Sequence, residues 1–157
     1  MRRAFEAANR SGDLSYAAYS CSYLNTNLLA AGDPLEQVQG EAERSLAFAQ
    51  KIRFGALIDR ISAQLGLVRT LRGLTPTFGR FDDANFDELR IEHRFTENPD
   101  LALAECWYWI RKLQARFFAG DHGAAVDAEL RAQRLLWASP TFELAEYLFF
   151  AALSGSA

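Results

Sequence analysis

The sequence predicts an all-α fold, an α/α superhelix of antiparallel helix pairs, and three observations support this prediction. Apolar residues recur at the 3.6-residue period of a helix along most of the chain, whereas the alternating pattern of a strand is not sustained over a useful length. Gly-Asp dipeptides separate successive helical segments at Gly12-Asp13, Gly32-Asp33 and Gly120-Asp121. The connections between the segments are short, which makes consecutive helices antiparallel neighbours.

Each Gly-Asp turn is suited to end one helix and begin the next. Glycine adopts the left-handed conformation that ends a helix, and the aspartate carboxylate accepts hydrogen bonds from the free N–H groups of the following helix. Pro34 follows the second turn and fits the first helical position. Asn98-Pro99 and Ser139-Pro140 begin two later helices by the same logic. We therefore expect helices over 2–10, 14–31, 34–53, 55–73, 100–119, 123–138 and 140–153.

The predicted helices of the first half differ in how much of their surface is apolar. The helix over 2–10 leads into the first Gly-Asp turn, and the helix over 34–53 carries an ordinary solvated face of charge pairs. The helix over 55–73 has one apolar face, formed by Leu57, Ile58, Ile61, Leu65 and Val68. The helix over 14–31 has two stripes, one of Leu14, Ala17, Cys21, Leu24 and Leu28 and the other of Tyr16, Tyr19 and Tyr23.

Residues 75–97 break this helical rhythm. The segment contains Pro76 and Gly79, and its phenylalanines are interspersed with acidic residues. A connection of this length in a compact domain is functional or partly structured. We expect a long ordered insertion, with a loop over 75–83 and a short helix over 84–94, held against the helical body by Phe78, Phe81, Phe86 and Phe95.

The helix over 100–119 is apolar on more than one side. Its main stripe consists of Leu103, Cys106, Trp107, Ile110, Leu113 and Phe117. Tyr108, Trp109 and Phe118 lie off that stripe, so neighbours must cover this helix on several sides. The following helix presents small residues that allow a partner helix to come close, namely Ala125, Ala128 and Ala132. Both features are typical of an inner helix in a stacked helical array.

Composition limits the classes of function. The chain has 157 residues, which is enough for one domain over 1–157 with a real core. Its net charge is -3, so no basic excess favours nucleic acid as a partner. No apolar run resembles a signal peptide or has the length of a membrane span, which favours a cytoplasmic protein without membrane insertion. Cys21 and Cys106 lie in helical patterns outside any metal or redox spacing, which predicts two buried thiols.

The sequence offers no catalytic, cofactor or metal motif, so we expect no enzymatic activity from this chain. The run Asp83-Ala84-Asn85 resembles the start of a calcium loop, but Glu88 and Arg94 stand where that loop needs glycine and a bidentate acid. His93 and His122 are far apart and lack cysteine or acid partners at ligand spacing. Phosphate-binding loops, nucleophile elbows and kinase signatures are likewise missing.

The tyrosine stripe suggests an interaction surface. Tyr16, Tyr19 and Tyr23 could line a peptide groove with Asn25 and Asn27 on its polar rim, or could pack between helices. If a groove exists, we expect it to be lined by Tyr16, Tyr19, Tyr23, Asn27, Trp109 and Arg116.

The hairpin over 100–138 resembles a tetratricopeptide repeat in part. Trp109 stands at the aromatic position of the first helix, Gly120-Asp121 at the turn, and Ala125 and Ala132 at small positions of the second helix. Leu113 departs from the pattern, which has a small residue there. The earlier hairpins match more weakly, so the repeats are degenerate and tetratricopeptide-like.

A wider resemblance covers nearly the whole chain. It is carried by the motifs 12–19, 27–35, 71–79, 106–121 and 145–147, which read GDLSYAAY, NLLAAGDPL, LRGLTPTFG, CWYWIRKLQARFFAGD and AEY. These motifs resemble the helical middle region of very large bacterial signalling proteins. In that family a Ser/Thr-kinase-like domain and a predicted ATPase domain precede this region, and a GAF domain and a sensor histidine kinase follow it. The family's catalytic residues lie in other domains.

The resemblance implies a non-catalytic protein-interaction or regulatory scaffold, cut from a much larger signal-transduction kinase. Its partners would be neighbouring domains of the parent protein or a separate signalling protein. A small-ligand sensor is the alternative, favoured by a pocket bordering the insertion, and an enzyme domain of unknown chemistry is the third hypothesis. Because a cut helical array exposes apolar surface, we also expect self-association through an end face that carries Phe142, Leu148, Phe149 and Leu153.

Overall fold

The computed structural model describes residues 2–139 and 141–155, and within these ranges the secondary structure is helical, without strands. The expectation of an all-α protein is therefore confirmed. The α-helices are α1 (Arg2–Ser11), α2 (Leu14–Ala30), α3 (Leu35–Lys51), α4 (Gly55–Leu71), α5 (Glu88–Glu97), α6 (Ala102–Phe118), α7 (His122–Gln133) and α8 (Thr141–Ser154), and two short 3₁₀ helices are η1 (Pro99–Leu101) and η2 (Leu136–Ala138).

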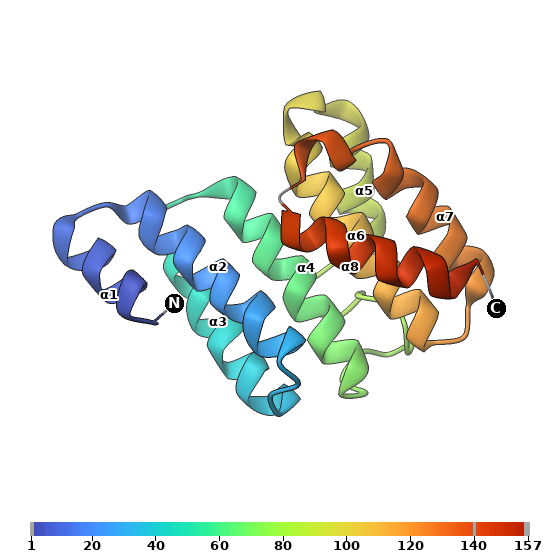
Figure 1. Ribbon diagram of the computed structural model, residues 1–157, viewed down its shortest axis with the longest axis horizontal. Coiled ribbons are helices and arrows are strands. Elements are labelled where there is room, and N and C mark those ends of the chain that lie inside the picture. The colour runs from blue at the N-terminus through green and yellow to red at the C-terminus, as the bar shows by residue number, and fades with distance from the viewer. Residues whose placement is uncertain (1, 140, 156–157) are drawn as a thin grey trace.

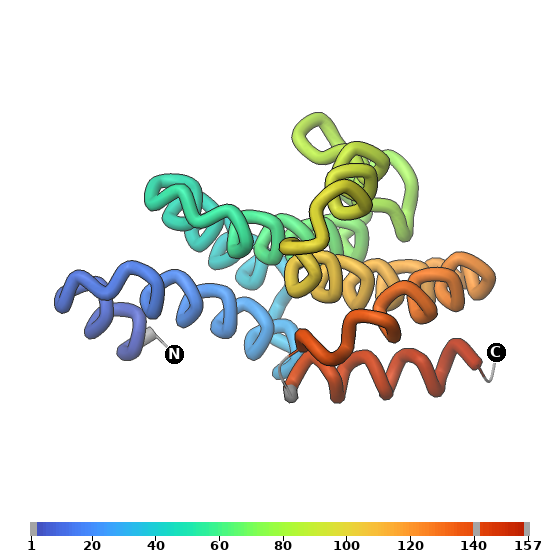
Figure 2. The backbone as a smooth tube through the Cα atoms, turned by 90° about the horizontal axis from the view of Figure 1, so that it is seen from above, coloured from blue at the N-terminus to red at the C-terminus, as the bar shows by residue number. Residues whose placement is uncertain are grey.

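Most consecutive helices pack against one another along the chain. Contacts join α1 to α2, α2 to α3, α3 to α4, α4 to α6, α5 to α6, α6 to α7, and α7 to α8. Two further contacts skip one helix, because α2 also touches α4 and α6 also touches α8. The first four helices form one half of an elongated molecule and α5 to α8 form the other (Figure 1). The loop that precedes α5 and α5 itself project from one side of the body, whereas α8 lies along the opposite side (Figure 2). Whether the hairpins form a regular superhelix stays a prediction.

Two of the three Gly-Asp turns act as the sequence predicts. Gly12 and Gly120 have φ values of 79° and 70°, and the following aspartates cap α2 and α7. Asp13 accepts a hydrogen bond from the N–H of Tyr16 at 2.9 Å. At the remaining turn, Gly32 has a φ of 76°, but the following helix, α3, starts later than expected. Pro34 is itself the N-cap of α3, and its carbonyl accepts from the N–H of Val38.

Two other boundaries also differ from expectation. The helix predicted over 123–138 ends at Gln133, and the chain continues through a separate 3₁₀ turn, η2. The short helix predicted over 84–94 is shifted to Glu88–Glu97. Its start is set by two aspartates: Asp83 Oδ1 accepts from the N–H groups of Asn85 and Phe86 and so makes a turn, and Asp87 then caps α5. These local side-chain bonds compete with the helix over 84–87.

The core has two parts. One surrounds α2, α3 and α4, and the larger one surrounds α6 and includes residues from the insertion. Of the four phenylalanines expected to hold the insertion, Phe81 and Phe95 are fully buried and Phe86 packs against the same cluster. Phe78 is 48% exposed, so its predicted anchoring role is wrong. Phe81 lies directly over the backbone of Gly66 in α4, where a Cβ atom would come within 2.7 Å of its ring.

Both cysteines are buried and free, as predicted. Burial raises the pKa of Cys21 and of Cys106 from 9.0 to about 11. At pH 8 only about one thiol in a thousand is then ionised, against about one in ten at the ordinary value. Because the thiolate is the reactive form, we expect both thiols to react with a disulfide dye only as fast as the protein unfolds. Absorbance kinetics with and without urea measure this, and fast labelling of either thiol in the native protein would contradict it.

Candidate functional site

Helix α8 turns apolar side chains toward solvent and charged side chains toward the protein interior, which is the reverse of an ordinary surface helix. Over residues 142–154, the part of α8 whose burial is described, the exposed positions are all apolar and follow helical spacing on one side of the helix. Phe142 is 40% exposed, Leu148 57% and Phe149 60%. The exposed alanine Ala145 lies between these large side chains, and a second one, Ala152, follows three residues after Phe149. We call this set the α8 face, and it consists of Phe142, Ala145, Leu148, Phe149 and Ala152.

The two acids of α8 point the other way, into the protein. Glu143 is 1% exposed and forms an ion pair with Arg60 of α4, which is also 1% exposed. Glu146 accepts a hydrogen bond from Nη1 of Arg111 on α6 at 2.6 Å. Both pairs fix the rotation of α8 about its own axis. The apolar side chains of the α8 face are held outward because the acids are bound inward.

Arg60 is the centre of the contact between the two halves of the molecule. Its guanidinium lies over the rings of Tyr23 on α2 and Trp107 on α6, at 4.5 and 4.2 Å from the ring centroids. Burial lowers the pKa of Arg60 below its ordinary value, and the carboxylate of Glu143 opposes that shift. Rings and carboxylate together compensate a desolvated cation. One buried side chain therefore joins α2, α4, α6 and α8.

The insertion is held on α6 by a second set of charges. Glu88 of α5 is 3% exposed, and its Oε2 lies 3.2 Å from Nζ of Lys112 and 3.3 Å from Nη2 of Arg116. Glu92, one turn further along α5, pairs with Lys112 and accepts from the hydroxyl of Tyr108 at 2.7 Å. Burial, followed by the charge of Glu88, raises the pKa of Tyr108, which keeps its phenol protonated and donating. The insertion is thus an ordered part of the fold.

The six residues predicted to line a groove lie in different surroundings. Tyr16 is 58% exposed, and Asn27 is also exposed. Asn25, which was expected beside Asn27 on the rim, is instead buried and donates from Nδ2 to Gln64 at 3.3 Å. Tyr19 packs edge-on against Phe54, with ring centroids 5.5 Å apart, and Tyr23 contacts Arg60.

The other two predicted groove residues are interior. Trp109 is 4% exposed and donates from Nε1 to Glu105 at 3.0 Å, and Arg116 is 7% exposed and bound to Glu88. A groove on α2 would therefore not include Trp109 or Arg116, and for the four residues of α2 it stays a prediction.

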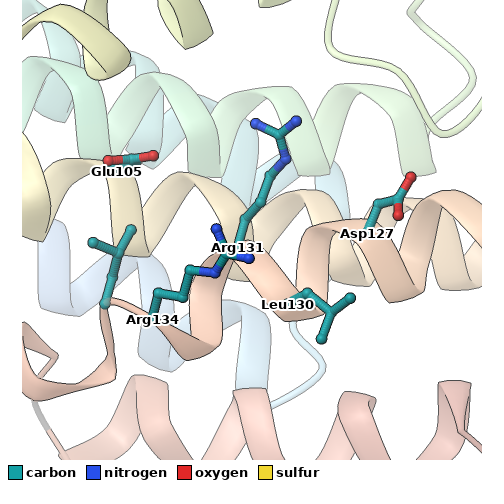
Figure 3. Close-up of a pocket in the computed structure, with 6 residues that line it drawn as sticks. Glu105, Asp127, Leu130, Arg131 and Arg134 are labelled. Atoms are coloured by element: carbon teal, nitrogen blue, oxygen red, sulfur yellow. The ribbon is translucent and has the colours of Figure 1, made fainter.

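A pocket of about 460 Å³ lies between Glu105 of α6 and the side chains of α7 (Figure 3). The guanidinium of Arg131 lies 4.6 Å from the centroid of the Trp109 ring and forms part of the wall. Two arginines and two acids share the lining, so the pocket has no dominant charge. It is lined by Glu105, Asp127, Leu130, Arg131, Arg134 and Leu135.

A larger cleft, of about 770 Å³, lies between α4 and the insertion. Arg94 of α5 reaches across it to pair with Asp59 of α4. His93 is mostly exposed and lies 3.3 Å from Glu97 on its own helix. Within residues 2–139 and 141–155, three or more histidine, cysteine or acidic side chains do not gather in a way that would hold a metal ion.

Comparison of the chain with protein-family models, with curated proteins and with solved structures gives no match. The resemblance to the helical region of bacterial signalling kinases therefore stays a prediction. Over the part of the chain that the structure describes, every helix is too short or too polar to cross a bilayer.

The sequence indicated part of the α8 face and missed what holds it. Phe142, Leu148 and Phe149 were expected at an exposed end, and they are exposed, whereas Leu153 is half-buried. The inward acids were not predicted. The available signal was weak: Glu143 is one of two acids in the largely apolar helix α8, and its partner Arg60 directly follows Asp59 in α4.

Proposed function

We propose that this chain is a non-catalytic protein-interaction scaffold whose contact surface is the α8 face. The proposal rests on the orientation of the side chains of α8. Its two acids form ion pairs with arginines inside the protein, whereas Leu148 and Phe149 are exposed to solvent. A contiguous exposed apolar surface is costly in a monomer and typically marks an interaction site. The buried ion pairs make this surface rigid, which reduces the entropy lost on binding.

The resemblance adds a setting to this proposal. In a large bacterial signalling protein, such a segment would contact the neighbouring ATPase or kinase domains, or would recruit a separate signalling protein. A partner that binds the α8 face in only one state of the parent protein would shift the population toward that state. This is the regulatory role that the scaffold would have.

The proposal is tested by capturing proteins with the immobilised chain and with one variant of the α8 face. We expect the wild-type chain to retain a protein other than itself, either the adjoining ATPase or kinase domains or a protein from cells that encode it. The double variant L148E/F149E should lose that capture, because it places two charges at the centre of the contact.

The matched control is L89E. Leu89 lies on α5, is 79% exposed, and undergoes the same chemical change on a different surface. Circular dichroism should show both variants folded. Capture that L148E/F149E retains, or that L89E loses equally, would refute the assignment of this surface.

The cleft beside the insertion supports a second candidate, the sensing of a small polar ligand. The cleft has the volume of an ordinary ligand site, and its lining includes Asp59, Arg90, His93 and Arg94. Such a ligand would raise the thermal midpoint of unfolding of the wild-type chain and not that of R90A.

A further inference from the structure

The α8 face has a seven-residue repeat. Phe142 and Phe149 are seven residues apart, as are Ala145 and Ala152, and all four are exposed. Leu148 lies beside this seam. Two aromatic and two small positions thus alternate along α8 at the three- and four-residue spacing of a helix–helix seam. A helix that matches this surface must present small residues opposite the phenylalanines and large residues opposite the alanines.

α8 itself meets that requirement when it runs antiparallel to a second α8. In the antiparallel register centred on residue 147, Phe142 faces Ala152 of the other copy, and Ala145 faces Phe149 of the other copy. The two-fold axis generates the same two contacts in reverse. A parallel pair would instead oppose phenylalanine to phenylalanine and alanine to alanine, which leaves clashes and voids. The face is therefore self-complementary in one orientation.

We infer that the α8 face binds a second copy of this chain, paired antiparallel through α8. The inference rests on the proposed function, because it takes the α8 face as a contact surface, and it adds a second copy of the chain to the proteins that this surface binds.

The charges of α8 are compatible with a second copy of the chain at this surface. The only charged side chains of α8 within its described residues, Glu143 and Glu146, are each bound to an arginine inside their own copy. Two acidic chains can therefore meet at this surface without opposing unpaired carboxylates, although each carries a net charge of -3.

The size of the face sets the expected strength of the dimer. A fully exposed phenylalanine offers about 200 Å², so Phe142 and Phe149 contribute about 200 Å² together at their exposed fractions of 40% and 60%. With Leu148 and the two alanines, the face supplies roughly 350 Å² of apolar area per copy. A standard stable interface buries about 800 Å² per partner. Because the face is less than half of that size, we expect a weak and reversible dimer, with a midpoint of about 100 µM.

Sedimentation velocity of the complete chain from about 1 µM to about 500 µM tests the inference. We expect a reversible shift from the 17.6 kDa monomer toward a dimer of twice that mass. A single monomeric species over the whole range would overturn the inference.

Two substitutions separate matched pairing from general hydrophobic adhesion. A145F adds apolar surface, yet it should weaken the dimer at least tenfold because the new ring meets Phe149 of the other copy. F149A should also weaken it, because it leaves alanine opposite alanine. The double variant A145F/F149A exchanges the two partners and should restore association to within about threefold of wild type. The antiparallel pairing of phenylalanine with alanine would be overturned by either of two results. One is an A145F dimer tighter than the wild type, and the other is a double variant that associates no more tightly than either single variant.

Circular dichroism and thermal unfolding of the four proteins confirm that each is folded, which is expected because both positions are exposed. The two proposals fail separately. A wild-type chain that stays monomeric but captures another protein through the α8 face would refute the homodimer and leave the scaffold proposal standing. A dimer with the expected response to A145F and to the double variant supports the homodimer whether or not a second protein is captured.

Discussion

Replacement of Glu143 by alanine is expected to lower the free energy of unfolding by roughly 3–5 kcal/mol, the cost of removing one partner of a buried ion pair. Arg60 is 1% exposed and would keep its charge without a carboxylate beside it. The rings of Tyr23 and Trp107 would remain, but ring faces compensate a desolvated cation less well than a carboxylate does. Urea unfolding followed by circular dichroism measures the change.

The matched control is the exposed pair of Arg44 and Glu41 on α3. The Arg44 side chain is 68% exposed, so R44A should cost about 1 kcal/mol or less. Equal costs for E143A and R44A would contradict the buried role of Glu143.

A double variant distinguishes the cost of an unpaired charge from the value of the pair itself. R60M/E143L replaces both charges by apolar side chains of similar size. Because the desolvation of both ions is then removed, its stability should be close to that of the wild type and well above that of E143A. A double variant as unstable as E143A would instead mean that the pair itself stabilises the packing of α8 on α4.

The helices were predictable because their signals are local. Apolar periodicity identified every α-helix of the body, and the pairs Gly12-Asp13 and Gly120-Asp121 marked two helix starts. The start of α5 was misplaced, although its signal was also local. Asp83 and Asp87 are both of a residue type that caps helices, but the sequence does not rank a turn at Asp83 against a helix over 84–87.

The candidate site was less predictable because its contacts are long-range. Arg60 and Glu143 are 83 residues apart in the chain, and neither has a motif around it. Arg116 was predicted to line a groove, but the insertion brings Glu88 over it. Trp109 was also predicted to line the groove, and Arg131 covers its ring instead. Helix periodicity predicts which side of a helix is apolar. Which segment of the chain covers that side depends on the topology of the fold, and periodicity does not show it.

The second large effect is expected at Phe81, which anchors the insertion. Its side chain is fully buried, packs edge-on against Tyr108 with centroids 5.9 Å apart, and lies on the backbone of Gly66. F81A should therefore cost roughly 3–5 kcal/mol through lost burial and the cavity left behind. Urea unfolding measures this, and F78A in the same loop is the control, because Phe78 is 48% exposed and its loss should cost about 1 kcal/mol or less.

The same contact predicts where F81A acts. The N–H of Phe81 donates to Oε1 of Glu88 at 2.7 Å, and Glu88 binds Lys112 and Arg116, so the ring and the charges of α5 hold the insertion together. Loss of the ring should loosen the segment over 75–97 before the rest of the fold. Limited proteolysis of F81A should then cut within these residues under conditions in which F78A stays intact. Cleavage spread evenly over the chain would instead mean that the insertion and the helical body unfold as one unit.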